Sequence, residues 1–369
     1  MHKLTFYPLG NADCCLVDLH NKKKILWDYA NKRDPDDDED KRCDLPKLLR
    51  DDLEAAKRDY YDVVTFTHAD DDHIHGFSEF FYLEHAEKYQ DDDRIKINDL
   101  WVPAAVILET GLSGEARILR SEARYRLKNG ERIRVFSKPE ALKDWLEGEG
   151  LSLEERQHLI TSAGKTVPTF KKDKDGVEFF VHAPFSETID DQEIDRNDAA
   201  IVVQATFLYN GCESKLILGA DSKHEIWSEI VNITKYYGRE LRLEWDVFNI
   251  SHHCSYTALS SEKGKTKTTP VPEVDWLFMK KGNKHCKLVS TSWSIPSKDT
   301  TQPPHRQAKN YYRDVESEHE GEFVVTMEHP SKTAPELLVI TLDCSGATVK
   351  KTRIGAASVI SSRPSPRVG

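Results

Sequence analysis

Residues 63–76 read Val-Val-Thr-Phe-Thr-His-Ala-Asp-Asp-Asp-His-Ile-His-Gly and are the most informative segment about the fold of this chain. Its first four residues form an apolar run that is typical of a buried strand. Directly after this run, the spacing His68-x-Asp70-x-Asp72-His73 places four polar side chains within six residues. Imidazole nitrogen and carboxylate oxygen are common ligands of divalent metal ions. The stretch therefore predicts a strand that ends in a metal-binding loop. The alternative is an acidic loop whose aspartates cap a helix.

Two later apolar runs also end in polar side chains. Asp221 follows the run at 215–219, and the pair His252 and His253 follows the run at 246–250. Alone, an aspartate before a helix is typical of an N-cap, and a histidine pair is not specific for a metal. Because a sheet delivers its strand ends to one edge, we expect the three loops to converge there.

The rest of the chain alternates strand and helix patterns. Apolar runs predict strands over 3–9, 14–19, 25–29, 63–66, 100–102, 177–181, 200–208, 215–219, 246–250, 287–291, 323–327 and 337–342. Apolar spacing predicts helices over 44–57, 113–128 and 223–235, and a helical insertion over 139–165. This order predicts an α/β fold with two sheets packed face to face and helices outside. We expect one domain over 1–350 and a flexible basic tail over 351–369.

Composition narrows the class of protein. The chain has 369 residues, of which 38% are hydrophobic and 31% charged, which is enough apolar material for a large core. No apolar window is long enough for a membrane span, and the N-terminal residues lack a secretory signal pattern, so a cytoplasmic protein is expected. The seven cysteines include no CxxC pair, so free thiols are expected. The net charge of −11 means that a nucleic-acid substrate would need a local basic patch.

The order of these motifs resembles the metallo-β-lactamase superfamily. The HxDxDH loop is followed by Gly219-Ala220-Asp221 and then by His252-His253-Cys254-Ser255. Aspartate in place of the second histidine is similar to the DNA-internalisation competence nucleases of the ComEC type, whose motifs read HADxDHIGG, GD and HHGS. Segments 9–13, 25–28 and 197–203 are similar to further segments of those proteins. The chain departs from the pattern at His75, Ala220 and Cys254, and it lacks their membrane domains. The resemblance implies an αββα sandwich with two mixed sheets and helices outside.

The resemblance also implies hydrolysis at two divalent ions, zinc or manganese, with magnesium as a third option. His68 and Asp70 would bind one ion, Asp72 and His73 would bind the other, and Asp221 would bridge them. One of His252 and His253 would complete the second site, and Asp72 would also orient the attacking water. His182 stands where many members place another ligand, although ComEC-type chains often carry a non-ligand histidine there. Cys254 is either a soft ligand or a small packed residue.

Several side chains are candidates for substrate contacts. Arg120 and Arg124 belong to a set of cations that share one helix face, and the set either contacts phosphates or is a solvated face paired with acidic loops. Lys265 lies in a second basic loop that we expect at the rim of the site. His75 either contacts substrate or caps a helix, and His305 matches a late HP segment of the competence nucleases.

The leading hypothesis is a metal-dependent phosphodiesterase or nuclease that acts on nucleic acid or a nucleotide. One alternative is a hydrolase of a small ester, lactone or nucleotide on the same fold. The other is an interaction module with a degenerate site that works through a protein partner, although the complete ligand set argues against it. The sequence does not indicate an oligomeric state.

Overall fold

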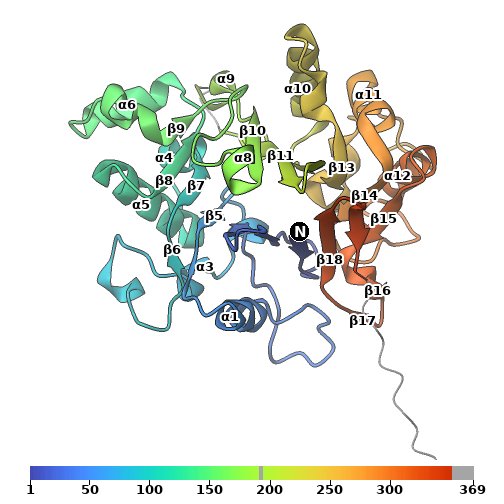
Figure 1. Cartoon of the computed structure of the whole chain (residues 1–369), viewed down its shortest axis with the longest axis horizontal. Coiled ribbons are helices and arrows are strands. Elements are labelled where there is room, and N and C mark those ends of the chain that lie inside the picture. Colours follow the sequence, from blue (N-terminus) through green and yellow to red (C-terminus); the bar gives the residue numbers. More distant parts are fainter. Residues whose placement is uncertain (191–193, 351–369) are drawn as a thin grey trace, which may run out of the picture.

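Two large mixed sheets and the helices around them make up the computed structural model, which describes residues 1–190 and 194–350. Figure 1 shows helices α5 and α6 on one flank of the molecule and α10, α11 and α12 on the other, with the sheets between them. The expected tail over 351–369 lies outside the described residues. The chain is a mixed α/β protein, as the strand and helix patterns predict.

The larger sheet has nine strands in the order β19-β18-β1-β2-β3-β5-β7-β8-β9. Their bounds are β1 His2–Phe6, β2 Cys15–Asp18, β3 Lys24–Trp27, β5 Val63–Thr65, β7 Leu100–Pro103, β8 Ile133–Phe136, β9 Ile160–Thr161, β18 Leu338–Asp343 and β19 Gly346–Val349. The pairs from β19 to β3 are antiparallel, and the pairs from β3 to β9 are parallel.

The smaller sheet has six strands in the order β10-β11-β12-β13-β14-β15. Their bounds are β10 Val177–Ala183, β11 Val202–Tyr209, β12 Cys212–Leu218, β13 Trp245–Asn249, β14 Gly282–Ser290 and β15 Glu322–Val325. The first two pairs are antiparallel and the other three are parallel. Two further sheets have two short strands each, β4 Tyr60–Tyr61 with β6 Lys96–Ile97, and β16 Pro330–Ser331 with β17 Ala334–Pro335.

Seven helices, six long ones and the shorter α4, lie on the outer faces of the two large sheets. Their bounds are α1 Leu45–Ala55, α4 Ala104–Leu108, α5 Gly114–Asn129, α6 Glu140–Gly148, α10 His224–Tyr236, α11 Pro272–Lys281 and α12 Arg306–Glu318. Short helices include α2 Asp71–Ile74, α3 Phe77–Phe80, α7 Leu153–Arg156, α8 Lys172–Asp175 and α9 Ser186–Asp190. Helix α1 shows why the sequence pattern works, because Asp44 caps its first turn by accepting from the Lys47 backbone N–H while its leucines face the core.

Alternating strand residues hold these layers together. In β12, Leu216 belongs to an apolar cluster that contains side chains of both large sheets, whereas Ile217 belongs to a cluster shared with α10, α11 and α12. In β3, Trp27 joins the cluster between the sheets, and Leu26 joins a third cluster shared with α1, α5 and α6. Successive side chains of a strand point to opposite faces, so each sheet packs on the other sheet through one face and on helices through the other.

The segment at 139–165 is helical only in part. Helix α6 buries Leu142 and Leu146 against the cluster of the nine-stranded sheet, as the expected apolar face requires. The chain then turns through α7 and adds β9 to the edge of that sheet. Arg156 ties this segment to α5 by donating from Nε to the Leu127 carbonyl oxygen at 2.8 Å. The segment therefore completes the sheet in addition to covering it with helices.

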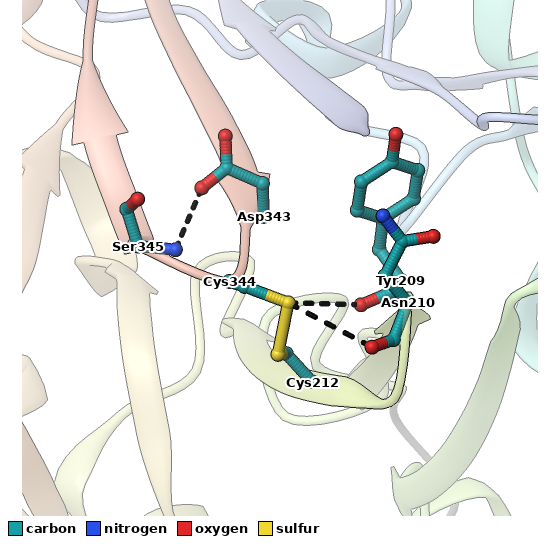
Figure 2. The surroundings of a disulfide bond; sticks show 6 residues. All are labelled: Tyr209, Asn210, Cys212, Asp343, Cys344 and Ser345. Carbon is teal, nitrogen blue, oxygen red and sulfur yellow. Dashed lines mark hydrogen bonds between the residues drawn. A yellow bond between two sulfur atoms is a disulfide. The ribbon is translucent and has the colours of Figure 1, made fainter.

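Two of the seven cysteines form a disulfide, so the expectation of free thiols is wrong for them. Cys212 at the start of β12 and Cys344 in the β18–β19 turn are joined across 132 residues (Figure 2). The sequence separation hides this pair, and only the packing of the two turns brings their Cα atoms to 5.2 Å. The other five cysteines are free and are buried or half-buried. Within the described part of the chain, no helix is both long and apolar enough to cross a membrane.

Candidate metal centre

Four loops meet where ends of the two large sheets come together. The β1–β2 loop brings Asp13, and the loop after β5 brings His68 to His73. The loops after β12 and β13 bring Asp221 and His253. Backbone hydrogen bonds pin these loops to one another. The Asp13 N–H donates to the Asp72 carbonyl oxygen at 3.0 Å, and the His252 N–H donates to the Ala220 carbonyl oxygen at 3.1 Å. The expected convergence of the strand-end loops is present.

Four buried side chains form the centre of the site, namely Asp13, His73, Asp221 and His253. One ligand atom from each lies within 4.8 Å of the others. The Nε2 atom of His73 is 3.4 Å from a carboxylate oxygen of Asp221 and 3.8 Å from one of Asp13. The Nε2 atom of His253 is 3.8 Å from the other Asp221 oxygen. Asp221 thus lies between the two imidazoles, and the four groups surround a space where one ion can contact all of them.

The remaining predicted ligands lie around this group. Asp72 is 3.1 Å from His253 Nε2 through Oδ2, and its side chain is 29% exposed. His252 Nε2 is 3.8 Å from Asp221, and its side chain is 25% exposed. His68 Nε2 is 3.6 Å from Asp70 Oδ2. The two neighbouring histidines therefore differ, since His253 belongs to the buried group and His252 reaches solvent.

Hydrogen bonds orient the imidazoles from behind. His73 donates from Nδ1 to Asp28 Oδ2 at 2.9 Å, which leaves Nε2 with a lone pair toward the centre. His253 donates from Nδ1 to the Thr291 carbonyl oxygen at 2.7 Å, with the same consequence. Asp28 is in turn held by the backbone N–H of Thr67 at 2.7 Å and by its hydroxyl at 2.8 Å. Partners of this kind, which fix the tautomer and ring orientation, are typical of metal-binding histidines.

The centre contains buried polar atoms that have no hydrogen-bond partner. They are Asp13 Oδ1, His73 Nε2, Asp221 Oδ1 and, beside them, His68 Nε2. A buried polar atom without a partner costs roughly 1–3 kcal/mol. A cation placed among these atoms removes that cost once the imidazole Nε2 atoms carry no proton, because each atom then has a lone pair and two of them belong to carboxylates. Imidazole with carboxylate fits zinc and manganese, so the donor set fits the divalent ions that the sequence predicts.

Burial disfavours the charged form of the groups in the centre, and the opposite charges around them decide the outcome. For His73, Asp28 and Asp221 outweigh burial and raise the pKa well above its usual value. For His253, Asp221 and a hydrogen bond with Asp72 outweigh burial and raise the pKa to about 9. The same imidazoles hold the pKa of Asp221 well below its usual value against burial. Protons on the two rings thus balance the carboxylates, and an ion has to displace them to bind.

The backbone is strained where these ligands enter. Ala220, His252, His253 and Cys254 all have positive φ angles, between 44° and 64°. This conformation favours glycine, and other residues adopt it at a cost of roughly 1–3 kcal/mol each. Gly219 has no such strain, but a Cβ there would lie 2.5 Å from Ser251 Oγ, so the two loops can approach only because this residue is glycine. Four residues with a left-handed backbone therefore lie in the turns that aim Asp221 and the histidine pair.

His182 lies elsewhere in the molecule. It donates from Nε2 to the Arg242 carbonyl oxygen at 2.9 Å, and burial lowers its pKa to about 4. It lines a cavity of about 730 Å³ together with Phe180, Phe185 and Tyr237. That cavity shares no lining residue with the four-residue centre. The structure therefore groups His182 with an apolar cavity beside α10, away from the proposed ligands.

The predicted substrate contacts are spread over several elements. His75 pairs with Asp71 at 2.8 Å on the exposed side of α2. His305 lies at the start of α12, where its ring packs on Tyr256 with centroids 4.9 Å apart. The backbone oxygen of Lys265 accepts from Arg306 at 2.9 Å.

Arg120 and Arg124 lie on α5 and donate to the carbonyl oxygens of Glu109 and Ile107, at 2.6 and 2.8 Å. In the expected cationic face, Lys128 pairs with Glu149. The face is therefore engaged with neighbouring elements of the same chain.

Two residues of the centre are absent from the set of candidate ligands. Asp13 supplies a carboxylate to the four-residue group, and Asp28 orients His73. Both lie in segments that resemble the competence nucleases, 9–13 and 25–28. The sequence therefore contained an indication of both residues, because Asp13 follows a turn and Asp28 follows a buried strand. Neither carries a histidine neighbour, and only the pairing of β1, β2, β3 and β5 brings them to the loop at 68–73.

Comparisons with known proteins add little to these observations. No family model matches the chain, and no curated protein matches it. Among solved structures it is similar to the class B3 di-zinc metallo-β-lactamase LRA-12 from an Alaskan soil metagenome, with 11% sequence identity and a TM-score of 0.32. The match covers 73% of this chain and 85% of that one. A similarity at this TM-score shows neither the fold nor the activity of this chain.

Proposed function

We propose that this protein is a metal-dependent hydrolase with an αββα sandwich of the metallo-β-lactamase type, and that it cleaves phosphodiesters, with nucleic acid as the leading substrate. One observation carries the proposal, which is the buried group of Asp13, His73, Asp221 and His253 with its unpaired ligand atoms. A divalent ion bound there supplies Lewis-acid activation of water and of a substrate oxygen. Two aspartates and two histidines form a mixed donor set that suits manganese or zinc.

Side chains of this chain would hold and move the protons. Asp72 reaches solvent next to His253, so its carboxylate is placed to orient an attacking water and take its proton. His252 reaches solvent beside the same Asp221 oxygen that His253 approaches, where its imidazole is placed to donate a proton to the leaving oxygen. His73 and His253 would hold the ion, and Asp28 would keep His73 in the tautomer that binds it.

The phosphodiester part of the proposal has separate support. Three cations contact residues that neighbour the proposed ligands in the chain, with Arg196 paired to Asp70, Lys32 paired to Asp71 and Lys263 beside the Tyr256 ring. Trp293 is 41% exposed and lies close to Gly10 in the loop that leads to Asp13, so it offers a ring on which a base can stack. Positive charge and an exposed aromatic ring are the features that bind a phosphate backbone and its bases.

Activity assays test the proposal. The purified protein is incubated with Mn²⁺, Mg²⁺ or Zn²⁺ and with plasmid DNA, linear DNA, RNA, cyclic nucleotides, a small phosphodiester, a carboxylic ester or a lactone. We expect metal-dependent cleavage of phosphodiesters that is lost in Asp221→Asn and His253→Gln. The matched control is His182→Gln, which keeps a hydrogen-bond donor for the Arg242 carbonyl and should retain activity. Turnover of the ester or the lactone alone would replace the phosphodiester proposal, and no metal-dependent turnover of any substrate would contradict the hydrolase proposal.

A salt titration separates a polymer from a small substrate. If nucleic acid is bound along α5, Arg120→Ala with Arg124→Ala should weaken binding to all sequences and flatten its dependence on salt. Both side chains also hold α4 through backbone carbonyls, so melting temperatures are measured for the same variants. An unchanged salt slope in a folded double variant would exclude this face as the contact.

A further inference from the structure

The side chains around Asp70 raise the question of how many ions the centre holds. The resemblance to the metallo-β-lactamase superfamily implies two, with His68 and Asp70 as ligands of one of them. The group of Asp13, His73, Asp221 and His253 already gives one ion four ligands, and Asp72 lies 3.1 Å from His253 as a fifth. Among the side chains that the structure describes, no second group of three or more histidine, cysteine, aspartate or glutamate residues converges in this way.

Asp70 is engaged by a cation of the protein itself. The Arg196 guanidinium donates from Nη1 to Asp70 Oδ1 at 2.7 Å and to the Ala69 carbonyl oxygen at 3.1 Å. From its other side it donates to both carboxylate oxygens of Glu109, from Nε at 3.0 and 2.9 Å and from Nη2 at 2.7 Å. Arg196 is therefore clamped between α4 and the HxDxDH loop. A guanidinium held on two carboxylates is a fixed positive charge, because its planar donors match carboxylate geometry and it does not lose its proton.

The third ligand that such a second site would need is elsewhere. His182 uses Nε2 for the Arg242 carbonyl oxygen and lines the cavity beside α10. Of the side chains that the resemblance assigns to that ion, only His68 and Asp70 remain, with Asp221 shared, and Asp70 is 36% exposed. His252 is also near Asp221, at 3.8 Å from its Oδ2 atom, but its side chain reaches solvent and does not join a converging group with His68 and Asp70. An ion at that position would also have to share Asp70 with the positive charge of Arg196, and like charges only a few ångströms apart repel.

We infer that the centre holds one divalent ion per chain, bound by Asp13, His73, Asp221 and His253 with Asp72, and that the Arg196 guanidinium stands in for a second ion beside Asp70. This inference rests on the proposed metal-dependent function and specifies its metal content. Arg196 is thus a positioning residue, which keeps a single positive charge at the place where a second ion would supply two.

The inference can be tested without a substrate by measuring how many metal ions the protein binds at equilibrium with free metal. The protein is stripped with chelator and dialysed against Mn²⁺ or Zn²⁺, and the metal-to-chain ratio and affinity are measured by mass spectrometry of the metal and by calorimetry. We expect about one ion per chain in the wild type. In Arg196→Ala, which frees Asp70, we expect a second, weaker ion and a ratio that approaches two at saturating metal. Arg196→Lys keeps a positive charge and should stay near one.

Matched variants distinguish failure of this inference from failure of the proposed function. Lys223→Ala removes a nearby cation that pairs with Asp195 and Asp198, so it should leave the ratio at one. Asp70→Asn should change the affinity of the wild-type ion by no more than a few-fold, because Asp70 is not among its ligands. Melting temperatures show whether each variant is folded. Two tight ions in the wild type, with one lost in Asp70→Asn, would overturn the inference and keep the proposed function. A ratio of one in folded Arg196→Ala would also overturn it, and no bound ion in the wild type would overturn both.

Discussion

Replacing Asp28 by asparagine removes one negative charge and one acceptor behind His73. The buried Asp28 carboxylate accepts three hydrogen bonds, from the Thr67 N–H at 2.7 Å, the Thr67 hydroxyl at 2.8 Å and His73 Nδ1 at 2.9 Å. Asparagine has nearly the same shape, and it tolerates the φ angle of 55° at this position. The substitution therefore perturbs the hydrogen bonds and leaves the packing in place.

An asparagine side chain cannot accept all three hydrogen bonds. If its oxygen stays on the Thr67 N–H, its amide group faces His73, whose proton must then move from Nδ1 to Nε2, the atom that would bind the ion. If the amide flips, its N–H groups face the Thr67 N–H. Either arrangement leaves a buried donor unpaired at a cost of roughly 1–3 kcal/mol. Changes of this kind behind a metal-binding histidine lower metal affinity by about 10- to 100-fold, which is about 1.4–2.8 kcal/mol.

The assay is a competition between the protein and a fluorescent chelator for Mn²⁺ or Zn²⁺. We expect the affinity of Asp28→Asn to be about 10- to 100-fold below that of the wild type. The control is Asp62→Asn, because Asp62 also accepts a backbone and a side-chain hydrogen bond, from Lys24 and Arg58, but does not contact the centre. Wild-type affinity in a folded Asp28→Asn protein would refute the role of Asp28. An equal loss in Asp62→Asn would show that the effect is not specific to His73.

Three further predictions follow from the same contacts. Asp72→Asn should lower turnover by orders of magnitude, because it removes the carboxylate that would orient the attacking water. It should also lower the melting temperature in excess chelator, because the Asp72 carboxylate pairs with the His253 imidazole at 3.1 Å and the neighbouring imidazoles hold its pKa below its usual value; full activity would exclude Asp72 from the mechanism. The metal-free protein should be less stable at pH 9 than at pH 6.5. The pKa of His253 is raised to about 9, so the stabilisation from its protonation is complete below about pH 6.5 and is lost as the pH rises through 9. The melting temperature of His253→Gln should therefore depend less on pH than that of the wild type. Reducing the Cys212–Cys344 disulfide, or replacing both cysteines by serine, should lower the free energy of unfolding by about 2–5 kcal/mol, because the bond closes a long loop. An unchanged midpoint of denaturant unfolding would contradict this prediction.

The strand ends and the chemistry at each of them can be predicted from local sequence alone. A buried strand requires a run of apolar residues, and a metal-binding loop requires imidazole and carboxylate side chains. Each of these patterns involves residues that are adjacent in the chain, so each can be recognised without a structure. The loop at 68–73, Asp221 and the histidine pair are all present at the centre for this reason. The alternation of strand and helix patterns also indicated two sheets with helices, since each periodicity is local.

Which of these side chains face one another depends on the three-dimensional packing of the whole chain. Asp13 and Asp28 join the centre because strand pairing brings two distant loops to His73. The left-handed backbone at 252 and 253 sends one histidine into the buried group and leaves the other at the surface. The separation of His182 from the centre, the disulfide across 132 residues and the contact between Arg196 and Asp70 have the same origin. Side-chain direction and the distance between residues far apart in the chain depend on the register and packing of the whole fold, which no local pattern encodes.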